Sequence, residues 1–151
     1  MRLRIPVLVI IVASCLAIAS CGDSRSAEAQ IAAQLRAMAD AAEAGEVRKA
    51  ADVIADNYRD LRGNDRQDVV NQLRFARLQT GKLAIFLDID SISLITATLA
   101  EVDLKVRFAG IDTGRFAIDG AQYHFILECE QQGGDWLIVA ARWTQGSGEP
   151  R

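Results

Sequence analysis

The chain contains a single histidine, His124, and this scarcity excludes several kinds of chemistry. A local zinc motif needs a second ligand at suitable spacing, and the sequence around His124 offers none. Neither a serine nor a cysteine nucleophile has a suitably placed histidine, because Cys129 and His124 differ in strand parity and are expected on opposite faces. We therefore expect no metal site, no triad-type catalysis and no bound cofactor.

Basic surface and phosphate-binding loops are also lacking. The chain has 17 lysines and arginines against 20 acidic residues, and the arginines are scattered among the acids. A nucleic-acid surface needs a basic patch instead. The paired glycines Gly133-Gly134 are typical of a hairpin turn rather than of a phosphate-binding loop. Nucleic acid is therefore not an expected partner.

What the chain does have is an N-terminal segment with the three parts of a secretory signal peptide. Arg2 and Arg4 precede an apolar run, and small residues follow up to Ser20. The run is shorter than the roughly 20 apolar residues of a membrane-spanning helix. A permanent span is therefore the weaker interpretation, and an ordinary cleaved signal without a lipid stays open as an alternative.

The end of this segment, Ile18-Ala19-Ser20-Cys21, resembles the bacterial lipobox, whose cysteine is acylated and becomes the new N-terminus. Cys15 ends a second such pattern, but cleavage there would expose an apolar terminus. We predict a signal peptide over residues 1–20, lipidation of Cys21 and anchoring to a membrane, because two acyl chains hold a protein stably where one does not. Gly22 stands where aspartate often marks inner-membrane retention in enteric bacteria, which favours the periplasmic leaflet of the outer membrane.

The remaining chain is acidic and has one cysteine in its folded part. Loss of residues 1–20 would leave 15 lysines and arginines against 20 acids. Cys129 then has no disulfide partner, and its place in a strand pattern indicates a small buried residue. We expect a lipidated tether over residues 21–26, one domain over residues 27–145 and a disordered tail over residues 146–151.

Apolar periodicity predicts three helices in the first half of the domain. The first begins near Ser26 and ends at Gly45, a common glycine position after a helix. The second runs from Glu46 to about Asp56. The third starts at Asn64 as N-cap, with Gln67 as its capping-box partner. The expected buried residues of the three helices are, in order, Ile31, Leu35, Met38 and Ala42; Val47, Ala51 and Ile54; and Val69, Val70, Leu73 and Ala76.

From Lys82 onward the period changes to two, which predicts strands. The phase of the apolar residues slips between Ile89 and Ile92, which indicates a β-bulge near Asp90-Ser91. Further strands are expected over residues 101–108, 123–130 and 136–144, the middle one after a turn-rich segment between Gly110 and Gly120. His124 falls on a face with Glu128 and Glu130, where we expect solvent or an interface.

Helices followed by strands, with no strand expected between the helices, predict an α+β fold in which N-terminal helices cover one face of a curved antiparallel sheet. The bulge bends the sheet, so that the sheet and helices form a cone with a hollow end. The last strand, residues 136–144, is apolar on both faces. It is therefore expected to be central or to lie at an interface, and Leu137, Val139 and Trp143 are the interface candidates.

Several short motifs occur together in one order. They are residues 41–46 (AAEAGE), residues 54–58 (IADNY), residues 63–66 (GNDR), and the terminal GDWLI and ARW at residues 134–138 and 141–143. Over about residues 27–144 this order resembles the nuclear transport factor 2-like (NTF2-like, or SnoaL-like) superfamily, and more closely its small bacterial lipoproteins. The resemblance implies a cone-shaped α+β fold, a pocket between helices and sheet, and frequent dimers through the outer face of the sheet. Functions in the superfamily range from ketosteroid isomerase and polyketide cyclase to non-catalytic binding, so the fold does not select one.

The isomerase-like members use a helix-one tyrosine, a carboxylate base after helix two and a strand acid as oxyanion donor. Alignment on Ala44-Gly45-Glu46 places these roles on Met38, Arg62 and Tyr123, and none of the three matches. A shift of the alignment would bring Asp60 to the base position. The resemblance therefore gives little support to that reaction.

The candidate polar residues of the pocket are Tyr58, Asp60, Arg62, Asp65, Arg66 and Tyr123. Their alternating charges suit an anionic or zwitterionic ligand. A purely structural role is the open alternative, with Asp65 at a helix start and Arg66 paired with Asp60. We expect a non-catalytic envelope protein that binds a small hydrophobic or amphiphilic molecule or a protein. The alternative is an isomerase, dehydratase or cyclase using Tyr58 with one of the two aspartates, and a third interpretation is a homodimer or partner surface on the last strand.

Overall fold

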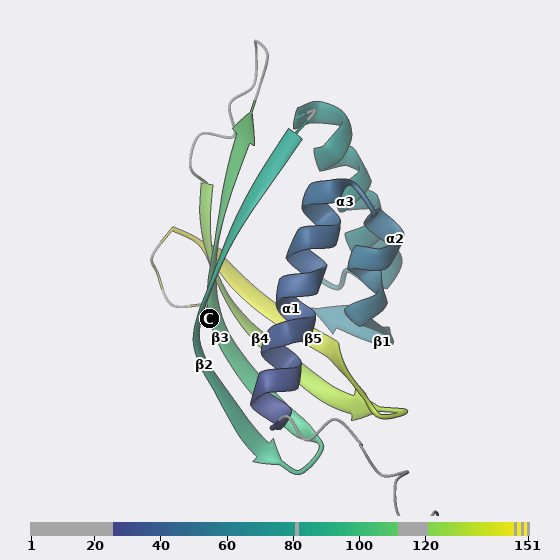
Figure 1. The fold of residues 1–151 in the computed structure, drawn as a ribbon, viewed down its shortest axis with the longest axis vertical. Helices are drawn as coiled ribbons and strands as arrows, with labels where there is room; N and C mark the ends of the chain where they lie inside the picture. The colour runs from purple at the N-terminus through teal and green to yellow at the C-terminus, as the bar shows by residue number, and fades with distance from the viewer. Residues whose placement is uncertain (1–25, 81, 112–120, 147, 149, 151) are drawn as a thin grey trace, which may run out of the picture.

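The computed structural model describes residues 26–80, 82–111, 121–146, 148 and 150. The predicted signal peptide and Cys21 lie outside these residues. So do most of the predicted tether, most of the turn-rich segment and most of the predicted tail. Figure 1 shows the arrangement of the described elements. They are α1 (Ala27–Ala44), α2 (Val47–Ala50), a short 3-10 turn (Ala51–Val53), β1 (Ile54–Asp60), α3 (Arg66–Thr80), β2 (Lys82–Thr96), β3 (Leu99–Ile111), β4 (Ala121–Gln132) and β5 (Asp135–Gln145).

The first helix confirms its predicted ends. The Ser26 side chain accepts a hydrogen bond from the backbone N–H of Ala29 at 3.2 Å, which satisfies one of the free donors of the first turn. Gly45 follows the last helical residue with φ +78°, a left-handed conformation that glycine adopts without strain. Ile31 and Leu35 are buried on the face that meets the sheet.

The second predicted helix is wrong in its second half. The helical backbone ends at Val53, and Ile54–Asp60 form the strand β1, which pairs in parallel with β5. Tyr58 and Asp60 are buried in this strand, whereas Asp56 and Asn57 are exposed. The sheet is therefore mixed rather than purely antiparallel, and a strand does lie between the helices. Its partner comes much later in the chain, so the local pattern could not reveal the pairing.

The start of the third helix lies one residue later than predicted. Asp65 accepts a hydrogen bond from the backbone N–H of Asp68, and Asp68 accepts one from the N–H of Asp65, each at 3.0 Å. This reciprocal pair is a capping box with Asp65 in the place predicted for Asn64 and Asp68 in the place predicted for Gln67. Asn64 does not cap the helix, because its backbone N–H and its side-chain amide both donate hydrogen bonds to the carboxylate of Asp60.

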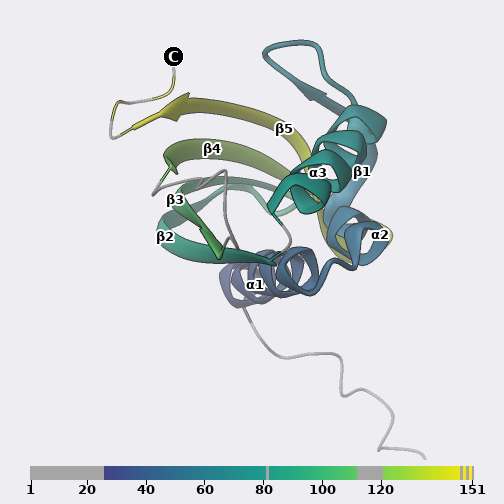
Figure 2. The same ribbon diagram turned by 90° about the horizontal axis from the view of Figure 1, so that it is seen from above.

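The five strands form one sheet in the order β1-β5-β4-β3-β2. The predicted bulge is confirmed: Ile89 pairs with Leu104 and Ser91 with Asp103, so that Asp90 is the extra residue. The sheet curves around α1 and α3, which lie on its concave side (Figure 2). The α+β fold with N-terminal helices packed on a curved sheet is thus as predicted.

A second bulge interrupts the pairing of β4 with β5. Glu128 pairs with Ala140 and Cys129 with Ile138, which leaves Val139 as the extra residue of β5. Before this bulge Ile138 faces the helices, and after it Ala141 does, so the alternation of β5 shifts by one residue. The Gly133-Gly134 turn that joins the two strands has φ +63° and +99°, which confirms the predicted hairpin.

The core lies between the helices and the concave face of the sheet. It contains Val102, Leu104 and Val106 of β3, as the alternation of that strand predicts. Cys129 is 2% exposed in this core, also as predicted. In the part of the chain that the structure describes, no helix has both the length and the apolar character needed to cross a membrane.

Candidate functional site

A cavity of about 560 Å³ lies between the helices and the concave face of the sheet. Its wall is mainly aliphatic and aromatic, and it receives side chains from α1, β1, α3 and each of the strands β2 to β5. A mostly apolar cavity with a few polar groups is the usual form of a small-molecule site. The sheet carries two bulges, in the pairings of β2 with β3 and of β4 with β5, and bulges bend strands. The cavity lies within the curve of this sheet.

Four aromatic rings follow one another along one wall. Phe108 meets Tyr123 edge-on with ring centroids 5.8 Å apart, Tyr123 lies 6.1 Å from Phe125, and Phe125 lies 5.9 Å from Trp143. All four residues line the cavity. Trp143, predicted as an interface residue on the outer face, therefore faces the cavity instead, because the bulge at Val139 reverses the parity of β5.

Tyr58 brings a hydroxyl group into this apolar wall. The residue is 4% exposed and lines the cavity. Burial, with a further contribution from the charge of Asp60, raises the pKa of Tyr58 to about 12. No other described residue hydrogen-bonds to the hydroxyl. Tyr58 is therefore a neutral group with an O–H available to a ligand.

Asp60 lines the same cavity, but its carboxylate is engaged in holding a turn. Oδ1 accepts hydrogen bonds from the backbone N–H groups of Arg62 and Asn64 at 2.8 and 2.9 Å, and Oδ2 accepts one from the Asn64 side chain at 2.8 Å. One interpretation of the sequence paired Asp60 with Arg66. The structure instead pairs Arg66 with Asp56. These three hydrogen bonds satisfy the buried carboxylate at the end of β1, which indicates a structural role.

Arg62 supplies a positive charge beside the aromatic wall. Its guanidinium carbon lies 4.9 Å from the centre of the Trp143 ring, a cation–π arrangement. Among the described residues none forms an ion pair with it. The three positions that the resemblance aligned with catalytic roles, Met38, Arg62 and Tyr123, all line the cavity, although none carries the isomerase side chain.

Asp65 and Arg66 do not join this site. Asp65 caps α3 and lies 3.4 Å from Arg59, and the hydrogen bond from Asp68 is the main reason that its pKa is lowered. Arg66 pairs with Asp56 at 3.1 Å. These residues line a separate small depression on the surface.

Two polar residues of the cavity were missed by sequence reasoning, Gln72 of α3 and Gln145 of β5. Gln72 shares a helix face with Val69 and Ala76, so its spacing carried a usable signal. Gln145 could not be placed without knowing the bulge in β5. The remaining interface candidates, Leu137 and Val139, are half-buried.

No protein-family model and no curated protein matches the sequence. Solved structures do match. A putative calcium/calmodulin dependent protein kinase II association domain from Xanthomonas campestris is 18% identical, with a TM-score of 0.65, over 79% of this chain and 87% of that one. An NTF-2 like protein of unknown function from Shewanella oneidensis MR-1 is 15% identical, with a TM-score of 0.63, over 76% and 96%. A ketosteroid isomerase-like protein from Erwinia carotovora atroseptica is 14% identical, with a TM-score of 0.60, over 80% and 96%.

These similarities establish the class of fold. The chain has the NTF2-like α+β fold, also described as cystatin-like among its structural neighbours. At identities of 14–18% they carry the fold alone, so the function has to be argued from the cavity.

Proposed function

We propose that the protein binds a small hydrophobic or amphiphilic molecule in the cavity, without catalysing its conversion, while anchored to the bacterial envelope through Cys21. The observation that carries this proposal is the 560 Å³ cavity with an apolar wall and few polar groups. The Tyr58 hydroxyl can donate to the ligand, and Arg62 can hold a polar or anionic end against Trp143.

An isomerase, dehydratase or cyclase is the competing function, because Tyr58 and Asp60 line the same cavity. Such an enzyme needs a carboxylate that is available to take a proton from the substrate. Both carboxylate oxygens of Asp60 already accept hydrogen bonds, and Asp65 lies outside the cavity. The structure of the turn therefore favours binding over acid–base chemistry.

A cavity-filling variant tests the binding proposal. Ala39 of α1 lines the cavity, whereas Ala37 of the same helix is exposed. Ala39→Phe should occupy part of the cavity and weaken binding of an apolar fluorescent probe at least about tenfold, a loss of about 1.4 kcal/mol. Ala37→Phe, the matched control, should bind the probe as the unchanged chain does. Equal binding in all three chains would show that the probe does not use the cavity.

Fractionation tests the anchor. The unchanged chain should partition with membranes, and Cys21→Ser should release it, because acylation needs the thiol. Membrane partitioning that persists in Cys21→Ser would contradict lipidation at this residue. Recovery with the outer rather than the inner membrane would support the proposed location.

The outer face of the sheet is the proposed place for a homodimer. Leu137 and Val139 are half-buried apolar residues of β5 that do not line the cavity. Sedimentation of the chain should show a dimer that Leu137→Lys weakens. A strict monomer at micromolar concentration would remove this part of the proposal.

A further inference from the structure

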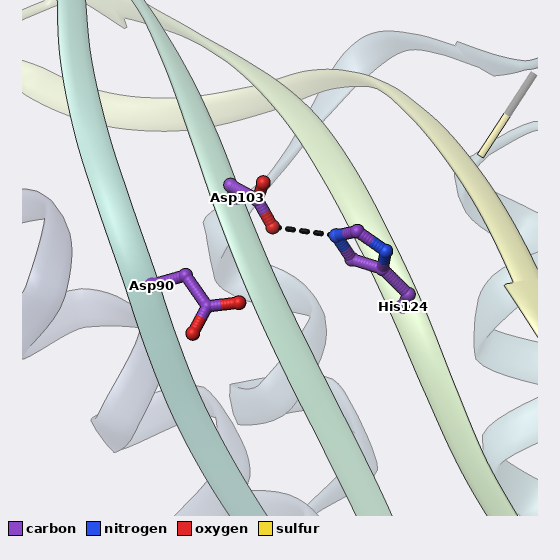
Figure 3. Close-up of side chains that lie close together, drawn as sticks. All are labelled: Asp90, Asp103 and His124. Atoms are coloured by element: carbon purple, nitrogen blue, oxygen red, sulfur yellow. Dashed lines mark hydrogen bonds and ion pairs between the residues drawn. The ribbon is translucent and has the colours of Figure 1, made fainter. Parts of the chain in front are cut away.

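Three potential metal ligands meet on the face of the sheet opposite the cavity. Asp90, Asp103 and His124 come from the neighbouring strands β2, β3 and β4, and each offers a ligand atom within 4.8 Å of the others (Figure 3). Asp90 is the extra residue of the first bulge. Bulges commonly redirect a side chain in this way. The cluster is thus assembled by strand pairing, which explains why no local spacing around His124 revealed it.

His124 is the buried member of the cluster. The sequence placed it in solvent or at an interface, but the residue is only 8% exposed. Its Nδ1 lies 3.1 Å from the carbonyl oxygen of Gly148, and its Nε2 lies 2.6 Å from Oδ1 of Asp103. The Gly148 oxygen also accepts a hydrogen bond from the Thr144 hydroxyl. A carbonyl oxygen has no proton to give, so Nδ1 must carry the hydrogen.

This assignment leaves Nε2 facing a carboxylate oxygen. A neutral imidazole with hydrogen on Nδ1 presents at Nε2 the lone pair that binds a metal ion. Zn–N and Zn–O bonds are each about 2.0–2.2 Å long, so a metal ion bound by both atoms needs the Asp103 side chain, which is 34% exposed, to rotate away from its present Nε2···Oδ1 separation of 2.6 Å. Metal-bound histidines characteristically donate their other ring N–H to a backbone carbonyl, as Nδ1 does here.

The surrounding charges favour a divalent cation. The ammonium group of Lys105 lies 2.5 Å from Asp90 Oδ2, and its side chain is 36% exposed. The position therefore already attracts a cation, and a flexible lysine can leave it. Two carboxylates balance the charge of one divalent ion.

We propose that Asp90, Asp103 and the Nε2 atom of His124 form a binding site for a divalent transition-metal ion of the Zn²⁺ type, with Lys105 displaced toward solvent. One imidazole nitrogen and carboxylate oxygens are a ligand set that Zn²⁺ accepts, and the exposure of both aspartates leaves water to complete the coordination. Mg²⁺ and Ca²⁺ prefer oxygen ligands alone. The site lies on the outer face of the sheet and does not depend on the function proposed for the cavity.

The presence of one histidine makes the test direct. Zn²⁺ titrated into the untagged full chain, followed by NMR of imidazole nitrogens, should move the single Nε2 resonance to a metal-bound position with one-to-one saturation. Mg²⁺ should leave it unchanged. An Nε2 resonance that does not move at a large excess of Zn²⁺ would overturn the proposal.

Variants test the remaining ligands. Asp90→Asn and Asp103→Asn should each weaken Zn²⁺ binding at least about tenfold, a loss of about 1.4 kcal/mol. Lys105→Met should strengthen it about two- to fivefold, because it removes an exposed ion pair that competes with the metal. Asp88→Asn is the matched control on the same strand and should change affinity less than about twofold. Asp90→Asn lies at an exposed bulge, so it keeps the test decisive if Asp103→Asn does not fold. Unchanged affinity in Asp90→Asn would also overturn the proposal.

Discussion

Substitution of Asp60 separates a structural carboxylate from a catalytic one. Asp60 is 9% exposed, and its side chain accepts three hydrogen bonds, two from backbone N–H groups and one from the Asn64 amide. The Asp60 carbonyl also accepts from the N–H of Gly63 at 3.0 Å. The carboxylate therefore holds the turn that carries Arg62 to the rim of the cavity.

The expected loss of stability follows from these contacts. Asp60→Ala leaves the N–H groups of Arg62 and Asn64 without their acceptor, and water replaces it only in part. Because one hydrogen bond to a charged group contributes about 1.5–3 kcal/mol, and the turn is partly open to solvent, we expect a loss of about 2–4 kcal/mol. Asp60→Asn keeps an oxygen for the two backbone donors but places its amide against the Asn64 amide, so the expected loss is about 1–2 kcal/mol.

Urea denaturation of the two variants and the unchanged chain measures these differences. The unchanged chain should be the most stable, Asp60→Asn less stable and Asp60→Ala the least stable. The slope of the free energy of unfolding against urea concentration should be the same in all three. A loss of less than about 0.5 kcal/mol in Asp60→Ala would refute the structural role. An increase in stability would indicate a carboxylate kept at a cost for catalysis, and would favour the enzyme.

Three further predictions concern the helix ends, the core and the cavity wall. Gly63→Ala and Gly45→Ala should each cost about 1 kcal/mol in urea denaturation for their positive φ, because the Arg77 guanidinium near Gly45 is the end of a flexible side chain that can move away from a Cβ; a loss near zero in either variant would contradict the strain. Ile31→Ala, at a side chain 1% exposed, should cost about 2–5 kcal/mol by the same measurement, and a loss below this range would mean that α1 is loosely packed. Because the pKa of Tyr58 is raised from 10.0 to about 12, its contribution to stability should be complete below pH 10 and lost as the pH rises to about 12. Tyr58→Phe should flatten that part of the stability profile, and an unchanged profile would contradict the shift.

Local sequence signals were sufficient for the elements whose ends are fixed by their own residues. Ser26 caps α1 through its side chain, and Gly45 ends the helix in the left-handed region, as the spacing predicts. The bulge at Asp90 was visible as a change of phase in one strand. In each case the residues whose type or spacing predicted the feature are also the residues that form it.

The errors lie where distant pairing decides the structure. Ile54–Asp60 is a strand because it pairs with β5, and its short polar sequence shows no such preference alone. The bulge at Val139 depends on pairing with β4 and reverses the faces of the residues after it. Trp143 was therefore assigned to the wrong face of the sheet.

The candidate site was predicted in part for the same reason. Tyr58, Asp60, Arg62 and Tyr123 do line the cavity, where the resemblance to NTF2-like proteins had indicated a pocket. Asp65 and Arg66 are near in sequence but turn toward the capping box and Asp56. Gathering of Asp90 and Asp103 around His124 depends on three strands in register, which no local spacing encodes.

Native mass spectrometry of the chain, purified in a mild detergent from the cells that make it, tests the central claim of a ligand-binding cavity most directly. The unchanged chain and Ala37→Phe should retain a small molecule that is not the detergent, and Ala39→Phe should have lost it. No added mass on the unchanged chain, or the same added mass on Ala39→Phe, would contradict binding in the cavity.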